Sequence, residues 1–238
     1  MDFYQLLVLI IIFSVIQSIA GVGILLFGTP ILLIFGYSFS EVLWILVPIS
    51  CALSLFQIIE GYEFIERKGE HLLLTAPILM ITLFLVIQYK YILDMKSLVG
   101  FFLVLISLCR MIKSINKRIL TLAYKSKKLI FPFIAIIHGL SNLGGAPLAI
   151  FISSLERDRL KANVNIAFIY FILALSQLFI ITVYDIDSFK YNNLIFIPVA
   201  IVIHAFVRRN LFFKIDNSFF RSFINTIVLF FGIICLIN

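Results

Sequence analysis

The chain has 238 residues, of which 63% are hydrophobic and only 13% charged, and it carries a net charge of +7. A soluble globule of this length needs more polar surface than these residues supply, so the composition excludes a soluble protein and indicates a membrane protein. The positive charge does not indicate a nucleic-acid partner, because the basic residues fall between apolar runs, where they are typical orientation signals.

The first apolar region, 3–36, is interrupted by glycine and proline over 21–30. Glycine and proline break helices, which leaves backbone N–H and C=O groups without their helical partners. Inside a bilayer such groups are tolerated only where protein surrounds them or where they line a cavity. We therefore expect a broken or re-entrant helix pair here, although the arm 3–20 is long enough to span a bilayer by itself. The N-terminus lacks a basic start and a small-residue cleavage site, so we expect a retained segment and not a signal peptide.

Further apolar runs approach the roughly 17 to 25 residues that a helix needs to cross the hydrocarbon. They are 40–58, 71–89, 97–112, 162–184, 191–207 and 217–237. A second interrupted region, 129–155, carries the sequence His138-Gly139-Leu140-Ser141-Asn142-Leu143-Gly144-Gly145-Ala146-Pro147. The arm after this break has about 10 residues and covers about half the hydrocarbon thickness, so the segment is expected to enter the bilayer and return.

The segment 113–128 is basic and contains no acid, which marks it as cytoplasmic. It is expected to be either a short helix on the anionic leaflet or a solvated linker. Counting spans from this segment, and placing the Arg67–Lys68 loop on the same side, puts both ends of 129–155 inside and both ends of 3–36 outside. We therefore predict an all-α polytopic membrane protein with inverted repeats at 1–112 and 129–238, joined by a basic cytoplasmic linker at 113–128.

Each repeat is expected to hold one broken or re-entrant hairpin followed by three transmembrane helices. Internal similarity supports a duplication, since Gly28-Thr29-Pro30 resembles Gly145-Ala146-Pro147. Pro30 and Pro147 are expected near the starts of the second arms, where a missing N–H costs little.

The start of a half-helix presents unpaired backbone N–H groups and about half a positive charge, which suits an oxyanion. Glycines let an anion approach the backbone, and small polar side chains donate hydrogen bonds to its oxygens. The candidate substrate-binding residues are Ser141, Asn142, Gly144, Gly145, Gly21, Gly23, Gly28, Thr29 and Ser18. The alternative is that the polar members cap the half-helices or bond a neighbouring helix.

His138 precedes the second break, where protonation would couple substrate movement to protons; the alternative is a neutral ring bonded to a backbone carbonyl. Other polar residues either line a path or bond neighbouring helices. They are Asn163, Asn165, Gln177 and Asn225. His204, near Arg208, and Glu60, near a span end, are expected to need no special role, since such groups reach the headgroups.

The cysteines Cys51, Cys109 and Cys235 fall in separate spans, so neither a disulfide framework nor a metal site is expected. The chain also lacks a glycine-rich phosphate-binding loop, which argues against direct use of ATP.

In its two glycine-rich motifs and its two-half layout the chain resembles the TauE/SafE family, the sulfite-exporter-like permeases. The resemblance implies a permease that moves sulfite, thiosulfate or an organosulfonate across the bacterial inner membrane. Neither enzyme activity nor a cofactor is expected, because the residues offer no paired nucleophile and base and no metal cluster. The expected partners are therefore a small anion and the lipid bilayer. An anion channel, and less favourably a membrane enzyme or assembly factor, remain the alternatives.

Overall fold

The computed structural model describes residues 1–65, 69–89, 92–112, 118–119, 121–122, 127–156, 158–212, 214 and 217–237, with the backbone alone over 69–74, 127–128 and 217–224. These residues form helices and no strand. Within them, four segments are long and apolar enough to cross a membrane: α1 (Phe3–Ala20), α3 (Phe39–Glu60), α9 (Arg159–Tyr184) and the run Tyr191–Asn210. The described part of the chain is thus a helical bundle of the kind that membrane proteins form.

The other helices are α2 (Ile24–Ile34), α4 (Gly69–Gln88), α5 (Met95–Met111), α7 (Lys127–Ser141), α8 (Gly145–Leu155), α10 (Phe196–Asn210) and α11 (Asn217–Ile237). Single 3-10 turns lie at η1 (Tyr62–Phe64), η2 (Ile186–Ser188) and η3 (Tyr191–Ile195). Each predicted span coincides with a helix. The run predicted at 191–207 begins as the turn η3, so its α-helix starts only at Phe196.

Both predicted interruptions are confirmed. The first helix ends at Ala20, Gly21 has a φ of +78°, and α2 begins at Ile24. The second interruption places Asn142 at a φ of +63° between α7 and α8. Glycine and asparagine are the residues that adopt this left-handed conformation most readily, so each turn is built from a suitable residue.

The predicted position of Pro30 is wrong, whereas that of Pro147 is confirmed. Pro147 is in the first turn of α8, but Pro30 lies well inside α2. The chain breaks earlier than the glycine–proline pattern indicates because Gly28 serves helix packing: a Cβ there would lie 2.7 Å from Leu46 Cδ1 of α3. Gly28 and Thr29 therefore belong to the helix and not to the break.

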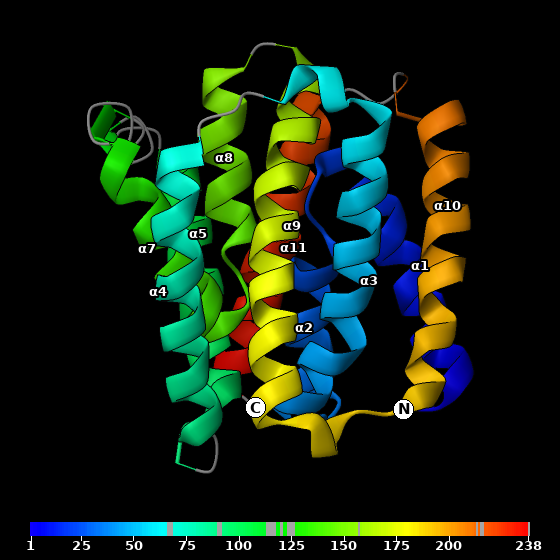
Figure 1. Ribbon diagram of the computed structural model, residues 1–238, viewed down its shortest axis with the longest axis vertical. Helices are drawn as coiled ribbons and strands as arrows, with labels where there is room; N and C mark the ends of the chain where they lie inside the picture. Colours follow the sequence, from blue (N-terminus) through cyan, green and yellow to red (C-terminus); the bar gives the residue numbers. More distant parts are fainter. Residues whose placement is uncertain are drawn as a thin grey trace.

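The helix pairs enter the bundle from opposite ends (Figure 1). The start of α1 and the end of α2 lie at the lower end of the view, whereas the start of α7 and the end of α8 lie at the upper end. At the centre α3 lies along α9, flanked by α1 with α10, α4 with α7 and α5 with α11.

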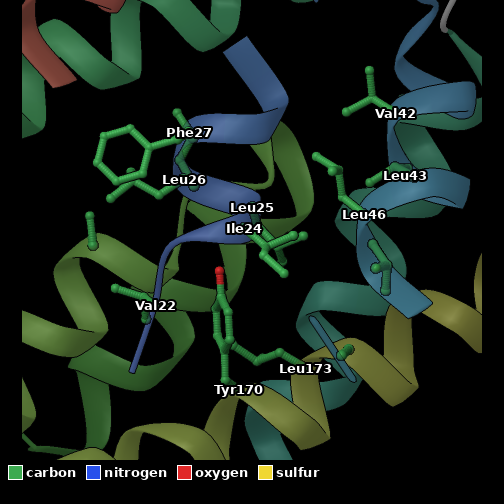
Figure 2. Close-up of a cluster of buried hydrophobic side chains, with 14 of the residues drawn as sticks. Val22, Ile24, Leu25, Leu26, Phe27, Val42, Leu43, Leu46, Tyr170 and Leu173 are labelled. Atoms are coloured by element: carbon green, nitrogen blue, oxygen red, sulfur yellow. The ribbon is translucent and has the colours of Figure 1, made fainter. Parts of the chain in front are cut away.

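The short helix α2 is enclosed by protein. Every residue from Ile24 to Leu33 is buried, and Figure 2 shows the start of α2 facing α3 through Val42, Leu43 and Leu46. Large apolar side chains such as Val202 and Phe230 are exposed on the outside of the bundle, as on a lipid-facing surface. The interrupted backbone is therefore shielded in the way that the bilayer requires.

Parts of the topology prediction lie outside the described residues. These include Arg67 and Lys68 and most of the basic segment 113–128.

Candidate functional site

Three polar residues of α9 lie on one side of the helix. Asn163, Tyr170 and Gln177 are spaced by seven residues, which is about two turns, so they form a row about 21 Å long. All three are buried. Each has a polar atom without a hydrogen-bond partner among the described residues: Asn163 Nδ2 and Oδ1, the Tyr170 hydroxyl and Gln177 Oε1. We name this row the α9 polar stripe.

The α9 polar stripe passes both chain breaks. A Cβ on Gly21 would lie 3.1 Å from Asn163 Nδ2, so the first break touches one end of the stripe. At the second break, a Cβ on Gly145 would lie 2.6 Å from the Tyr170 hydroxyl. Figure 2 shows the Tyr170 ring rising from α9 with its hydroxyl directed toward Ile24, the first residue of α2. The hydroxyl therefore lies between the starts of α2 and α8.

The second break is closed by His138. Its Nδ1 accepts a hydrogen bond of 3.1 Å from the Gly144 N–H. A neutral ring bonded in this way carries its proton on Nε2, which lies beside the Gln177 side chain without a hydrogen bond of regular geometry. The ring centroid lies 5.5 Å from that of Tyr170.

The bond to Gly144 favours a neutral His138 ring. The ring is bonded to a backbone amide, whereas a bond to a backbone carbonyl was expected. Proton coupling at His138 stays a prediction, and a second proton on Nδ1 would break the bond to Gly144.

The first break is closed in the same manner by Gln17. Its Oε1 accepts a hydrogen bond of 3.1 Å from the Ile24 N–H, and its Nε2 lies 3.3 Å from Ser50 Oγ of α3. Gln57 of α3 donates to the Gln17 carbonyl at 3.0 Å. Unpaired backbone amides were expected at the half-helix starts; those of Ile24 and Gly144 are instead capped by side chains, as buried backbone donors usually are.

On α3, two further buried atoms, Ser54 Oγ and Gln57 Oε1, have no hydrogen-bond partner within the described residues. Because α3 lies along α9, the polar groups of both central helices border the region of the breaks.

The predicted hydroxyl and amide donors already have partners in the protein. Asn142 Nδ2 donates to Thr29 Oγ1 at 3.0 Å, and Asn142 Oδ1 accepts from Gln177 Nε2 at 3.0 Å. Ser141 Oγ donates to the Ile137 carbonyl at 2.7 Å. The Asn142 bonds match the alternative in which small polar residues join neighbouring helices, whereas the Ser141 bond stays within its own helix; direct anion contact by these residues stays a prediction.

The glycines at the breaks allow tight backbone packing. A Cβ on Gly23 would lie 2.6 Å from the Gln17 nitrogen, and one on Gly144 would lie 2.5 Å from His138 Cβ. Gly145 differs from these two, because its Cβ would approach the Tyr170 hydroxyl. Of the predicted glycines, Gly145 therefore has the clearest relation to the α9 polar stripe.

Asn165 and Asn225, which were expected either to line a path or to bond neighbouring helices, both bond neighbouring segments. Asn165 Nδ2 donates to the Phe64 carbonyl at 3.0 Å, and Asn225 Nδ2 donates to the Ser107 carbonyl at 3.4 Å. Tyr170, the central member of the stripe, is absent from the predicted site. Its signal in the sequence is a tyrosine in the middle of an apolar span, since tyrosine usually lies at membrane interfaces.

The hydrogen-bond donors near the two chain breaks are mostly neutral groups. The buried acid among the described residues is Asp185, in the loop after α9, where its carbonyl accepts from Trp44 Nε1 at 2.8 Å. In the described part of the chain, no group of three or more His, Cys, Asp or Glu residues is placed to hold a metal ion, and the three cysteines are free.

No protein-family model, curated protein or solved structure matches this chain.

Proposed function

We propose that the chain is a secondary transporter that binds a small anion beside the α9 polar stripe, between the starts of α2 and α8. The observation that carries this proposal is the row of buried polar atoms without partners that passes both chain breaks. Each such atom costs about 1–3 kcal/mol, so a row of them is unfavourable as plain packing. Such groups are usually explained by bound water or a bound solute.

The donors around the breaks favour an anion. Tyr170 offers a hydroxyl proton, His138 offers Nε2–H in the tautomer that its bond to Gly144 requires, and Asn163 offers an amide. The positive ends of the α2 and α8 dipoles start in the same region, as in carriers whose half-helices meet at the substrate. Sulfite, thiosulfate and organosulfonates fit this chemistry, since they present several acceptor oxygens, and they are the substrates that the TauE/SafE resemblance implies.

Equivalent bonds at the breaks support an internal repeat. Gln17 and His138 each cap a backbone amide just after their own helix, and they are 121 positions apart. Gln57 and Gln177 each reach a residue at a break from a central helix, and they are 120 positions apart. With helix pairs that enter from opposite ends, these bonds favour inverted repeats at 1–112 and 129–238 that rock around a central site.

A transport assay tests the proposal. The purified protein, reconstituted in liposomes, is expected to take up at least one labelled anion among sulfite, thiosulfate, taurine and sulfoacetate, with a rate that saturates at high substrate. Conductance that rises without saturation would support the anion channel instead. Failure to move any of these anions, by protein shown to be folded in the same liposomes, would contradict the proposal.

We assign the carrier to the bacterial inner membrane on the TauE/SafE resemblance. The length and apolar character of α1, α3 and α9 support a bilayer location.

A further inference from the structure

A second polar cluster lies at the upper end of the bundle, where α1 and α10 end beside the end of α3. Glu60 Oε2 lies 2.9 Å from Arg208 Nε, and Glu60 Oε1 lies 3.4 Å from His204 Nε2. His204 Nδ1 lies 2.8 Å from Ser18 Oγ. We name Glu60, His204, Arg208 and Ser18 the Glu60 cluster. His204 and Glu60 were expected to have no special role, but the His204 side chain is only 1% exposed and pairs with Glu60.

Arg208 fixes the direction of the Glu60 carboxylate. The Arg208 guanidinium carbon lies 3.9 Å from the centroid of the Phe212 ring, and that of Arg159 lies 4.3 Å from the same centroid. Arg159 also donates to the Phe212 carbonyl. With Arg208 held in this stack, Glu60 cannot turn away from His204 without loss of its ion pair.

The hydrogen bonds of Ser18 set the protonation of the histidine ring. The Ser18 hydroxyl donates to the Ser14 carbonyl at 2.7 Å, so its oxygen accepts from His204 Nδ1–H. His204 Nε2 is then left beside Glu60 Oε1. Without a second proton, a nitrogen lone pair faces a carboxylate oxygen and the contact is repulsive; with one, the contact becomes an ion pair.

The charged groups around His204 come from several elements. Glu60 belongs to α3, Arg208 to α10 itself and Arg159 to the start of α9, whereas α1 contributes the uncharged Ser14 and Ser18. The turn η3 lies at the other end of α10, where Tyr191 is exposed. The partly exposed Glu60 carboxylate thus lies between the Arg208 guanidinium and the buried ring of His204.

We propose that Glu60 and His204 form a proton-binding site whose occupancy sets the position of the upper end of α1, next to the chain break at Gly21. Ser18 is three residues before Gly21, so its bond to His204 holds the last turn of α1, and Arg159, next to the cluster, donates to the carbonyl of Ile19 in the same turn at 3.4 Å. The link from this site to anion movement rests on the proposed transport function, whereas the proton site itself does not.

Nitrogen NMR of the full-length protein, labelled on its histidine rings and held in lipid nanodiscs, tests the proton site. Spectra are recorded between about pH 5.5 and 8.5, the range in which histidine normally changes charge. His204→Asn identifies the His204 signals.

A doubly protonated His204 ring is the signal expected of the proton site. In Glu60→Gln the doubly protonated population at a given pH is expected to fall at least about tenfold, because the carboxylate no longer stabilises the charged ring. Glu41→Gln, at the opposite end of α3, is the matched control and is expected to leave His204 unchanged. A ring that is neutral throughout the range, or that is insensitive to Glu60→Gln, would overturn the proton site.

The link to α1 is tested by uptake into liposomes at a series of pH values. The wild-type rate is expected to change with pH, and the profile is expected to be flat in His204→Asn. Ser18→Ala removes the bond between His204 and α1 and is expected to flatten the uptake profile. A wild-type profile in either variant would overturn the link. Absence of uptake by the wild type would contradict the proposed transport function, and the NMR result alone would then decide the proton site.

Discussion

Thr29 and Asn142 are 113 positions apart in the chain, yet the Asn142 amide donates to the Thr29 hydroxyl at 3.0 Å. The same side chain accepts from Gln177 of α9. One amide therefore holds α2, the turn before α8 and α9 together. Because Thr29 is inside α2 and Asn142 is the turn residue itself, the two interrupted helix pairs fix each other's position.

Thr29→Val tests this connection. The side chain keeps its shape but can no longer accept from Asn142, which leaves a buried amide proton without its partner. We expect a loss of about 1–3 kcal/mol in stability, measured as thermal unfolding in detergent. Ser176→Ala is the control, because that hydroxyl donates to the Ile172 carbonyl of its own helix. Equal melting temperatures for the two variants would contradict the proposed role of the Thr29–Asn142 bond.

Two substitutions at Asn142 separate its backbone role from its side-chain role. Asn142→Gly and Asn142→Ala both lose the bonds to Thr29 and Gln177, but only glycine adopts the positive φ without strain. The alanine variant is therefore expected to be less stable than the glycine variant by about 1–2 kcal/mol. The comparison uses chemical unfolding in one detergent. A glycine variant that is no more stable than the alanine variant would show that the turn does not depend on its left-handed conformation.

The positions of the helices and of both breaks could be predicted because they depend on local patterns: apolar runs of spanning length, and glycines that interrupt them. The place of Pro30 could not, since whether Gly28 breaks a helix or packs one depends on Leu46, which comes from α3. The capping role of Gln17 likewise depends on how the chain folds back after Gly21.

The site was predicted only in part for a similar reason. Asn163 and Gln177 are noticeable as polar residues in an apolar span, but Tyr170 was counted as hydrophobic, so the seven-residue spacing of the stripe was not recognised. The pairing of Glu60 with His204 joins distant parts of the chain and has no local signal in the sequence.

Tyr170→Phe tests the α9 polar stripe. It removes the hydroxyl that lies between the starts of α2 and α8 and keeps the ring that fills the space. If that hydroxyl donates to the bound anion, loss of about 1–3 kcal/mol of binding reduces uptake at low substrate roughly tenfold or more.

Tyr184→Phe is the matched control for this variant, since Tyr184 is exposed at the end of α9. The Tyr170→Phe protein is expected to be folded and no less stable, because a buried hydroxyl without a partner is removed. Normal uptake by Tyr170→Phe would exclude the hydroxyl from the binding site.

Gly145→Ala is expected to destabilise the protein and to stop uptake, because the added Cβ would lie 2.6 Å from the Tyr170 hydroxyl and force the ring to move. Tyr170→Phe in the same chain removes the nearest atom of this clash, so it is expected to restore part of the lost stability but not uptake. Thermal unfolding of the single and double variants measures this coupling. Strictly additive effects would mean that the Cβ and the ring do not meet.

The contribution of Asp94 to the stability of the protein is expected to depend on pH. Its side chain accepts from the Ser97 hydroxyl and from backbone N–H groups at the start of α5, and these hydrogen bonds lower the pKa of the Asp94 carboxyl. A lowered pKa in the folded state adds stability that is present above the ordinary value of about 4 and is lost as the pH falls through the lowered pKa.

Asp94→Ala is therefore expected to cost about 1 kcal/mol or less at neutral pH, as for loss of an exposed helix cap. This difference from the wild type is expected to shrink as the solution is acidified below about pH 4. Unfolding curves at several pH values measure it. A difference that grows on acidification would contradict the assignment of Asp94 as an ionised cap.

The brevity of α2 and α8 has a consequence for biogenesis. Each has 11 residues and is about 16 Å long, too short to partition from the translocon into lipid as an independent segment. Since α2 lies against α3 and α8 against α9, each short helix becomes stable in the membrane only after the ribosome has made the long helix that follows it. In nascent chains truncated just before α3 or α9, the preceding short helix should therefore be cut by an added protease, whereas in chains that include the following helix it should be protected.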